Sequence, residues 1–216
     1  SVQRKKQLVV PVITARSRGR LRATVRELVY AATSVLALSL SARIKVIAPF
    51  TPVPFTLQTM ALHYLLFMHG ARAWRYIATY ILLGLAGLPV FAYGGGLAYV
   101  LSPTFGYIAG FVVGTLIAGK LLPEGTLSAR RGLLAGSAQL MTIYALGASW
   151  LATWYVLVRG ISPLQAFLTA VVTGIMPFVL WDAVKLCLAI PLSRLTVAAY
   201  YALLRRLRSS SLLRQH

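Results

Sequence analysis

Six runs of apolar residues, separated by short segments rich in glycine, proline and basic residues, dominate the hydrophobic pattern of the chain. A membrane-spanning helix needs about 20 predominantly apolar residues, and proline interrupts a helix. The pattern therefore predicts an all-α membrane protein with six transmembrane helices. The predicted spans cover residues 28–48, 55–68, 73–88, 104–122, 132–158 and 164–190.

The end of the sixth span needs a separate interpretation. Pro177 predicts a kink inside this span. Beyond Pro191, the apolar stretch 192–204 is short for a further span, so we expect it to extend the bundle on the cytoplasmic side.

The composition agrees with a membrane protein. Hydrophobic residues make up 58% of the 216 residues and charged residues only 12%, whereas soluble domains carry about 45–50% and about 25%. Six spans use about 120 positions, which leaves no room for a separate soluble domain. We expect a basic cytoplasmic tail at 1–26, a six-helix substrate-binding domain at 27–205 and a second basic cytoplasmic tail at 206–216.

The charge of the chain is a net +19, from 22 basic and three acidic residues. A basic surface can bind nucleic acid, but these basic residues lie between apolar runs, so we expect no nucleic-acid partner. Short cytoplasmic loops are enriched in Lys and Arg. With the N-terminus inside, 18 basic residues are cytoplasmic and only Arg43, Lys45 and Arg159 are external. We therefore expect a multi-pass protein of the cell membrane, in contact with lipid, with both termini cytoplasmic.

One acidic residue, Asp182, falls at membrane depth, whereas Glu27 and Glu124 lie at cytoplasmic span ends. Lys185 follows three residues later, on the same helix face. A charge inside a membrane costs about 2.5–3.5 kcal/mol, so the two residues form either a structural ion pair or the polar floor of a ligand pocket. In a pocket, Asp182 would accept hydrogen bonds and Lys185 would donate them. The bend expected at Pro177 favours the pocket.

Small residues predict two kinds of close helix contact. In the fourth span, a face with small residues spaced by four predicts tight packing against another helix of this chain; it consists of Gly106, Gly110, Gly114 and Ala118. The first span has two small-residue faces, and either is a candidate for docking a partner helix. These are Ala31 with Ser39, and Thr33 with Ala37 and Ser41.

Motifs for enzymatic chemistry are missing from the sequence. It contains neither an HExxH metal motif nor a GxxxxGK[ST] phosphate loop, and His63 and His69 have no carboxylate close in sequence. The run Gly94–Gly96 follows no strand and precedes no phosphate-binding lysine, so it predicts a turning external loop. We expect neither enzymatic activity nor a cofactor or metal.

The segment 44–59, IKVIAPFTPVPFTLQT, resembles a signature of the BioY family, the biotin-binding membrane component of energy-coupling-factor (ECF) vitamin transporters. Three further stretches agree in the same order. They are GLAGLPVF at 84–91, PTFGY at 103–107 and PFVLWDAVK at 177–185. The resemblance covers residues 28–195 approximately.

The resemblance implies a six-helix bundle like that of ECF S components. Such a subunit captures biotin and works with a transmembrane coupling subunit and two ATPase subunits, and we expect the small-residue faces of the first span to dock the coupling subunit. Asp182 and Lys185 would hold the ureido ring of biotin, or one of them its carboxylate, while the loop 91–96 closes over the ligand. The implied biotin-binding residues are Gln58, Phe91, Tyr93, Gly94, Gly95, Gly96, Trp181, Asp182 and Lys185.

Two positions depart from the family pattern. Trp181 stands where family members often have glycine, and Ala92 and Tyr93 stand in the loop where many have a side-chain amide. The hydroxyl of Tyr93 could replace that amide. An S component for another small vitamin-like solute is therefore the alternative function.

Overall fold

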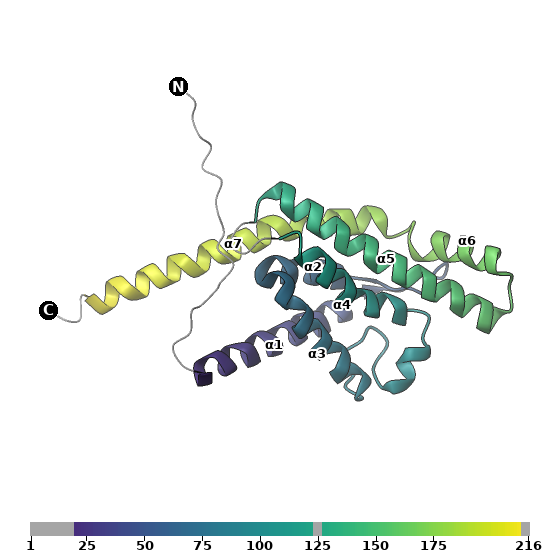
Figure 1. Ribbon diagram of the computed structural model, residues 1–216, viewed down its shortest axis with the longest axis horizontal. Coiled ribbons are helices and arrows are strands. Elements are labelled where there is room, and N and C mark those ends of the chain that lie inside the picture. Colours follow the sequence, from purple (N-terminus) through teal and green to yellow (C-terminus); the bar gives the residue numbers. More distant parts are fainter. Residues whose placement is uncertain (1–19, 123–126, 213–216) are drawn as a thin grey trace, which may run out of the picture.

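The computed structural model describes residues 20–122 and 127–212, which are mostly helical (Figure 1). Glu124 and the first part of the basic N-terminal tail lie outside these residues. The α-helices are α1 (Arg20–Arg43), α2 (Gln58–His69), α3 (Ala73–Leu85), α4 (Phe105–Gly119), α5 (Ala129–Arg159), α6 (Pro163–Gly174) and α7 (Val179–Leu212). The shorter elements are the strands β1 (Lys45–Val46) and β2 (Phe55–Thr56) and the 3-10 helices η1 (Gly70–Arg72) and η2 (Leu97–Leu101).

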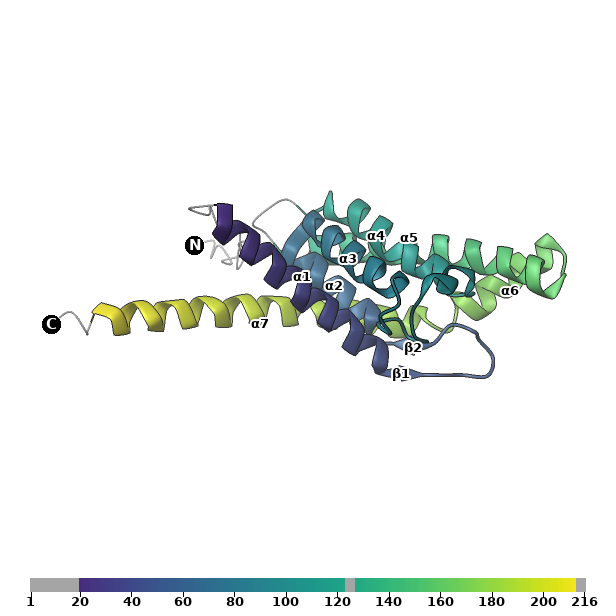
Figure 2. The ribbon, with the colours of Figure 1, turned by 90° about the horizontal axis from the view of Figure 1, so that it is seen from below.

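The helices form an elongated bundle with two distinct ends. Within it, α4 packs on α5, α6 lies beside α5, α2 lies against α7, and α1 lies against α3. The start of α1 and the end of α7 lie at one end, and the strands β1 and β2 lie toward the other (Figure 2).

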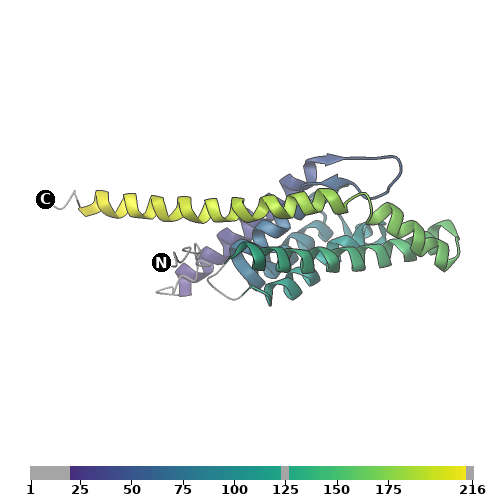
Figure 3. The same ribbon diagram turned by 90° about the horizontal axis from the view of Figure 1, so that it is seen from above.

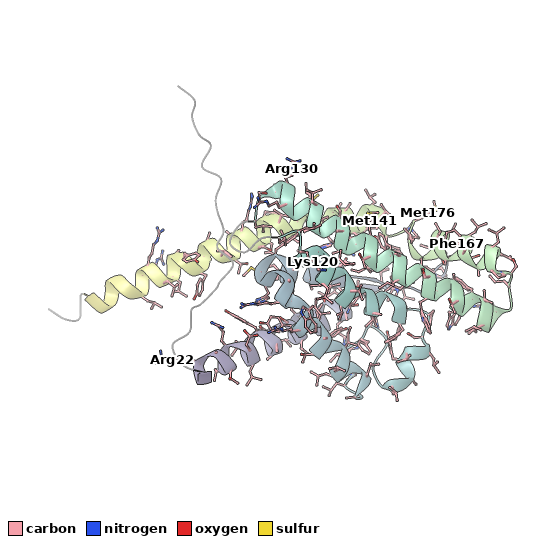
Figure 4. All side chains as sticks on the ribbon, viewed as in Figure 1. Arg22, Lys120, Arg130, Met141, Phe167 and Met176 are labelled. Carbon is pink, nitrogen blue, oxygen red and sulfur yellow. The ribbon has the colours of Figure 1, made fainter. Side chains whose placement is uncertain are left out.

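The outer surface of the bundle suits a bilayer, because large hydrophobic side chains are exposed over much of it. Met141, Phe167 and Met176 point outward on one flank, whereas Arg22 and Arg130 lie toward the end where α1 begins (Figure 4). Among the described residues, three helical segments are long and apolar enough to cross a membrane, namely Arg22–Arg43, Ala129–Arg159 and Val179–Leu207. The prediction of a helical membrane bundle is confirmed.

The first predicted span is wrong at both ends. Helix α1 begins at Arg20, before the predicted start, and it ends at Arg43. The chain then forms a hairpin, residues 45–56, in which β1 pairs antiparallel with β2 and Lys45 lies opposite Thr56. The prolines at 49, 52 and 54 exclude a helix here, and the extended backbone on either side forms a short ladder.

The sixth predicted span is broken and not merely kinked. Helix α6 ends at Gly174, residues 175–178 form turns, and α7 begins at Val179. Pro177 lies in the break, in agreement with its missing backbone donor. By contrast, α7 continues through Pro191 to Leu212 as a single long helix (Figure 3). Its 34 residues span about 51 Å at 1.5 Å per residue, which exceeds the hydrocarbon thickness of about 30 Å, so the helix extends beyond the bilayer.

The close packing predicted for the fourth span is confirmed, and the partner is α5 of the same chain. A Cβ atom added to Gly106 would lie 2.3 Å from the Cβ of Trp150, and one added to Gly110 would lie 2.8 Å from the Cα of Ile143. At Gly114 the added atom would lie 2.8 Å from a backbone oxygen of α5. These distances leave no room for a side chain.

We expect Gly110→Val to destabilise the protein by about 1–3 kcal/mol, because two additional methyl groups and a Cβ would force α4 away from the backbone of α5. Thermal unfolding of the purified protein in detergent measures the change. Val113→Leu, on the exposed side of α4, is the control and should unfold like the wild type. Equal unfolding temperatures for Gly110→Val and the control would contradict the packing argument.

Candidate functional site

A cavity of about 70 Å³ lies where α2, α4, α5 and α7 meet the hairpin and the α3–α4 connection. We call this connection, residues 86–104, the outer loop. The lining residues are mainly apolar and aromatic, with a few polar groups: Val53, Pro54, Thr56, Gln58, Thr59, Ala92, Tyr99, Thr104, Tyr107, Ile108, Phe111, Ile143, Tyr144, Gly174, Phe178, Asp182 and Lys185. This combination is typical of small-molecule sites.

The carboxylate of Asp182 is the central polar group of the cavity wall, and its residue is 3% exposed. Its Oδ1 accepts hydrogen bonds from the Thr59 hydroxyl, at 2.7 Å, and from the Lys185 Nζ, at 3.0 Å. Its Oδ2 accepts one from the Tyr144 hydroxyl. Donors from α2, α5 and α7 thus converge on one buried carboxylate, as a buried charge requires.

The ammonium group of Lys185 is equally well surrounded. Besides Asp182, it donates to the backbone oxygen of Thr56, at 2.7 Å, and to the Thr59 hydroxyl, at 3.3 Å. Thr56 belongs to β2, so Lys185 connects α7 with the hairpin. The sequence left open a structural ion pair or a pocket floor, and the structure combines both features, because the ion pair itself lines the cavity.

The break between α6 and α7 places Asp182 in the first turn of a helix. Backbone N–H groups and the helix dipole stabilise a negative charge at this position. Further along α7, Leu186, Ala189 and Ile190 continue the same buried face into the core. The helical periodicity that buries these apolar residues therefore also turns Asp182 toward the cavity.

Aromatic side chains form the apolar part of the wall. The hydroxyl of Tyr107 donates to the backbone oxygen of Gly174, at 2.8 Å. A Cβ atom added to Gly147 would lie 2.2 Å from the Tyr107 ring, so the glycine leaves space for the ring. Phe178 stacks on Phe55 of the hairpin, with centroids 4.4 Å apart. Flat apolar surfaces of this kind suit the rings and carbon chain of an organic ligand.

Tyr99 lines the cavity from the outer loop. Burial raises the pKa of its phenol above the usual value. The phenol is therefore neutral at physiological pH, and its hydroxyl can both donate and accept a hydrogen bond.

A second polar layer, formed by His63, Gln139 and Thr115, lies one helical turn deeper. The Gln139 Nε2 donates to the Thr115 hydroxyl, at 2.8 Å, so its Oε1 accepts from the Nδ1 of His63, at 2.7 Å. These bonds connect α2, α5 and α4 below the cavity. Within the described part of the chain, no group of three His, Cys, Asp or Glu residues could hold a metal ion.

Comparison with known proteins agrees with this architecture. Residues 14–202 match the sequence model of the BioY family. The chain belongs to the BioY family. The resemblance of segment 44–59 to this family is therefore confirmed.

Among relatives of this BioY family member, a Thermotoga maritima protein named biotin transporter BioY is 38% identical over 143 residues, which cover 65% of this chain and 79% of that protein. A Pyrococcus horikoshii protein named probable biotin transporter BioY is 35% identical, with 64% and 77% covered. The 2.1 Å crystal structure of the S-component for biotin from an ECF-type ABC transporter has a TM-score of 0.65 and 20% identity, covering 82% of this chain and 93% of that one. At this identity the structural likeness concerns the fold.

Three of the predicted BioY ligand residues line the cavity, namely Asp182, Lys185 and Gln58. The Gln58 Nε2 donates to the Tyr80 hydroxyl, at 2.8 Å. That hydroxyl in turn donates to the backbone oxygen of Val90. Gln58 therefore lines the cavity and also connects α2 to the outer loop through α3.

The other predicted residues do not line the cavity. Phe91 is fully buried behind the wall, against Tyr80 and Tyr99. Tyr93 is 46% exposed, and Gly94–Gly96 lie in the outer loop outside the lining. Trp181 is 57% exposed and lines an open groove of about 530 Å³ along the hairpin, which shares Thr56 and Lys185 with the cavity. Trp181 thus faces outward, although its neighbour Asp182 faces inward.

Sequence reasoning missed several polar residues of the wall, chiefly Thr59 and Tyr144. Thr59 directly follows Gln58 and ends the recognised segment 44–59. Tyr144 lies deep in the apolar helix α5, where a hydroxyl needs a partner. Hydroxyl groups inside predicted spans were the available signal for polar residues of the cavity wall. No spacing along the sequence, however, connects Thr59 or Tyr144 to Asp182.

We expect Lys185→Met to destabilise the protein by about 3–5 kcal/mol, because it leaves the buried Asp182 carboxylate without its counter-charge. The double variant Asp182→Asn/Lys185→Met should regain most of this loss, since it buries no charge. Thermal unfolding of the purified variants measures both effects. The exposed Lys120→Met is the control. An equal loss of stability in that variant would contradict the role of Lys185 as the counter-charge of Asp182.

Proposed function

We propose that this BioY family member captures biotin outside the cell and serves as the substrate-binding S component of an ECF transporter. The observation that carries the proposal is the convergence of Asp182, Lys185, Thr59 and Tyr144 on the wall of an otherwise apolar cavity. The names of the family and of the relatives agree with uptake of biotin.

The chemistry of biotin matches the wall of this cavity. Its ureido ring offers two N–H donors and one carbonyl acceptor, and its sulfur-containing ring and carbon chain are apolar. The Asp182 carboxylate would accept from the ureido N–H groups, while the hydroxyls of Thr59 and Tyr144, which donate to Asp182, would hold it in position. Tyr107 and Phe178 would pack against the apolar part. Lys185 would bind either the ureido carbonyl or the carboxylate at the end of the chain.

The position of the cavity suits capture from outside. The hairpin and the outer loop both contribute to its wall, and both belong to connections that the excess of cytoplasmic basic residues assigns to the outside. The opposite end of the bundle, with the start of α1 and the end of α7, would face the cytoplasm together with both termini (Figure 2).

Removing one hydroxyl from the cavity tests the assignment of the site. We expect Tyr144→Phe to weaken biotin binding by about 1–2 kcal/mol, or about five- to thirtyfold, because Asp182 loses a donor that orients it. Titration calorimetry on the purified protein measures the affinity. The control is Tyr64→Phe, which loses a hydrogen bond to Thr196 outside the cavity and should bind like the wild type.

The same titrations should include other vitamins as competitors, and mass spectrometry should detect biotin that remains bound during purification. If the wild-type protein does not bind added biotin but binds another vitamin, the proposed function changes from biotin capture to capture of that other solute. Equal affinities of Tyr144→Phe and Tyr64→Phe for biotin would remove Tyr144 from the site.

The energy for uptake would come from a transmembrane coupling subunit and two ATPase subunits, with α1 as the docking helix. In the structure Thr33 is exposed, Ala31, Ala37 and Ser39 are partly exposed, and Ser41 is buried. Thr33 and Ala37 lie among the exposed leucines 36 and 40, so small residues on an apolar surface would allow close approach of a partner helix.

We expect the double variant Ala31→Leu/Ala37→Leu to reduce the amount of coupling subunit that co-purifies with this chain, because the larger side chains prevent close helix contact. Biotin affinity should not change. Ala145→Leu, on the exposed side of α5, is the matched control. Full assembly of the double variant would exclude this face of α1.

A further inference from the structure

Arg43 and Lys45 are two of the three basic residues on the predicted external side, whereas most basic residues of the chain are predicted to be cytoplasmic. Both side chains contact the outer loop. Arg43 donates through Nη2 to the backbone oxygen of Pro89, and Lys45 donates through Nζ to that of Ala92. The Lys45 ammonium also lies 5.0 Å from the centre of the Tyr93 ring, within the range of a cation–π interaction. Two cations at the end of α1 thus bind the loop that covers the cavity.

The hairpin and the outer loop are fastened to different helices. The ring of Phe91 fills the space above Gly84 of α3, and the Gly96 N–H donates to the Gly84 oxygen, at 2.7 Å. The hairpin instead continues from α1, and the Leu57 N–H donates back to the Ser41 oxygen, at 3.3 Å. Separating the hairpin from the outer loop would therefore break the Arg43 and Lys45 contacts and leave these anchors intact.

Such a separation is needed for a ligand to enter or leave. The helical part of the wall cannot widen easily, because α4 contacts the backbone of α5 through its glycines. The hairpin and the outer loop supply the rest of the wall, including Thr56, Ala92 and Tyr99.

The hairpin also connects these contacts with the ion pair of the site. Lys45 lies directly opposite Thr56 in the ladder, and the Thr56 oxygen accepts the hydrogen bond from Lys185. One strand thus carries the cation that binds the outer loop, and the other carries the acceptor for the cation in the cavity. A ligand that draws Lys185 toward itself acts on the strand next to Lys45.

We propose that Arg43 and Lys45 form a latch that closes the hairpin against the outer loop, and that this latch sets the rate of ligand release. The two are positioning residues, because neither lines the cavity. The inference rests on the proposed function, since it concerns the release of biotin.

The full chain in lipid nanodiscs, loaded with radiolabelled biotin and chased with unlabelled biotin, measures the release rate. We expect Arg43→Gln/Lys45→Met to release biotin about tenfold faster, equivalent to about 1.4 kcal/mol. Lys45→Arg should retain slow release, because arginine can still donate to the Ala92 oxygen. Arg159→Gln is the matched control, since Arg159 is the third external basic residue, is exposed and lies at the end of α5. It should release biotin like the wild type.

Hydrogen exchange of the ligand-free protein gives a second measurement that needs no ligand. The amides of the outer loop should exchange faster in the double variant than in the wild type or in Arg159→Gln. Release within twofold of the control, or unchanged exchange in the outer loop, would overturn the latch. A wild-type protein that binds no biotin would refute the proposed function instead, and the exchange measurement would still decide on the latch. If the double variant unfolds, Lys45→Met alone replaces it in both measurements.

Discussion

The constraint on which the site depends is a carboxylate buried at membrane depth. An isolated charge there would cost several kcal/mol, so the chain must surround Asp182 with donors. It does so with Thr59 from α2, Tyr144 from α5 and Lys185 from α7. Because these donors come from three helices, satisfying one charge also fixes the relative positions of the helices that wall the cavity. The polar recognition surface and the helix packing therefore have a common cause.

The broken sixth span allows this arrangement while the N–H groups of Ile175, Met176 and Phe178 in the break keep backbone acceptors. The turns at 175–178 place the first turn of α7, and with it Asp182, beside the cavity. Unpaired backbone groups are tolerated at membrane depth only where they are buried or line a cavity. Phe178, in the break, lines the cavity itself. On the opposite side, the glycines of α4 hold α5 close, so the helical wall there is tightly packed.

The sequence predicts those features that depend on local composition and on periodicity. The apolar runs predict the helices, the spacing of Gly106, Gly110 and Gly114 predicts a close helix contact, and the spacing of Asp182 and Lys185 predicts their ion pair. The hairpin and the cavity wall depend instead on tertiary contacts between distant segments. The position of Phe91 likewise depends on the conformation of a loop that no sequence spacing describes.

The two polar layers also bear on the proposed division of binding and transport between different subunits. Four residues along α2 from Thr59, about 6 Å deeper at 1.5 Å per residue, His63 begins the hydrogen-bonded layer with Gln139 and Thr115. This layer joins α2, α4 and α5 below the cavity. Opening a path through these helices would break buried hydrogen bonds and separate α4 and α5, which are packed backbone to backbone. In the proposed transporter, release toward the cytoplasm would therefore require work from outside the chain, which would be the task of the ATPase subunits.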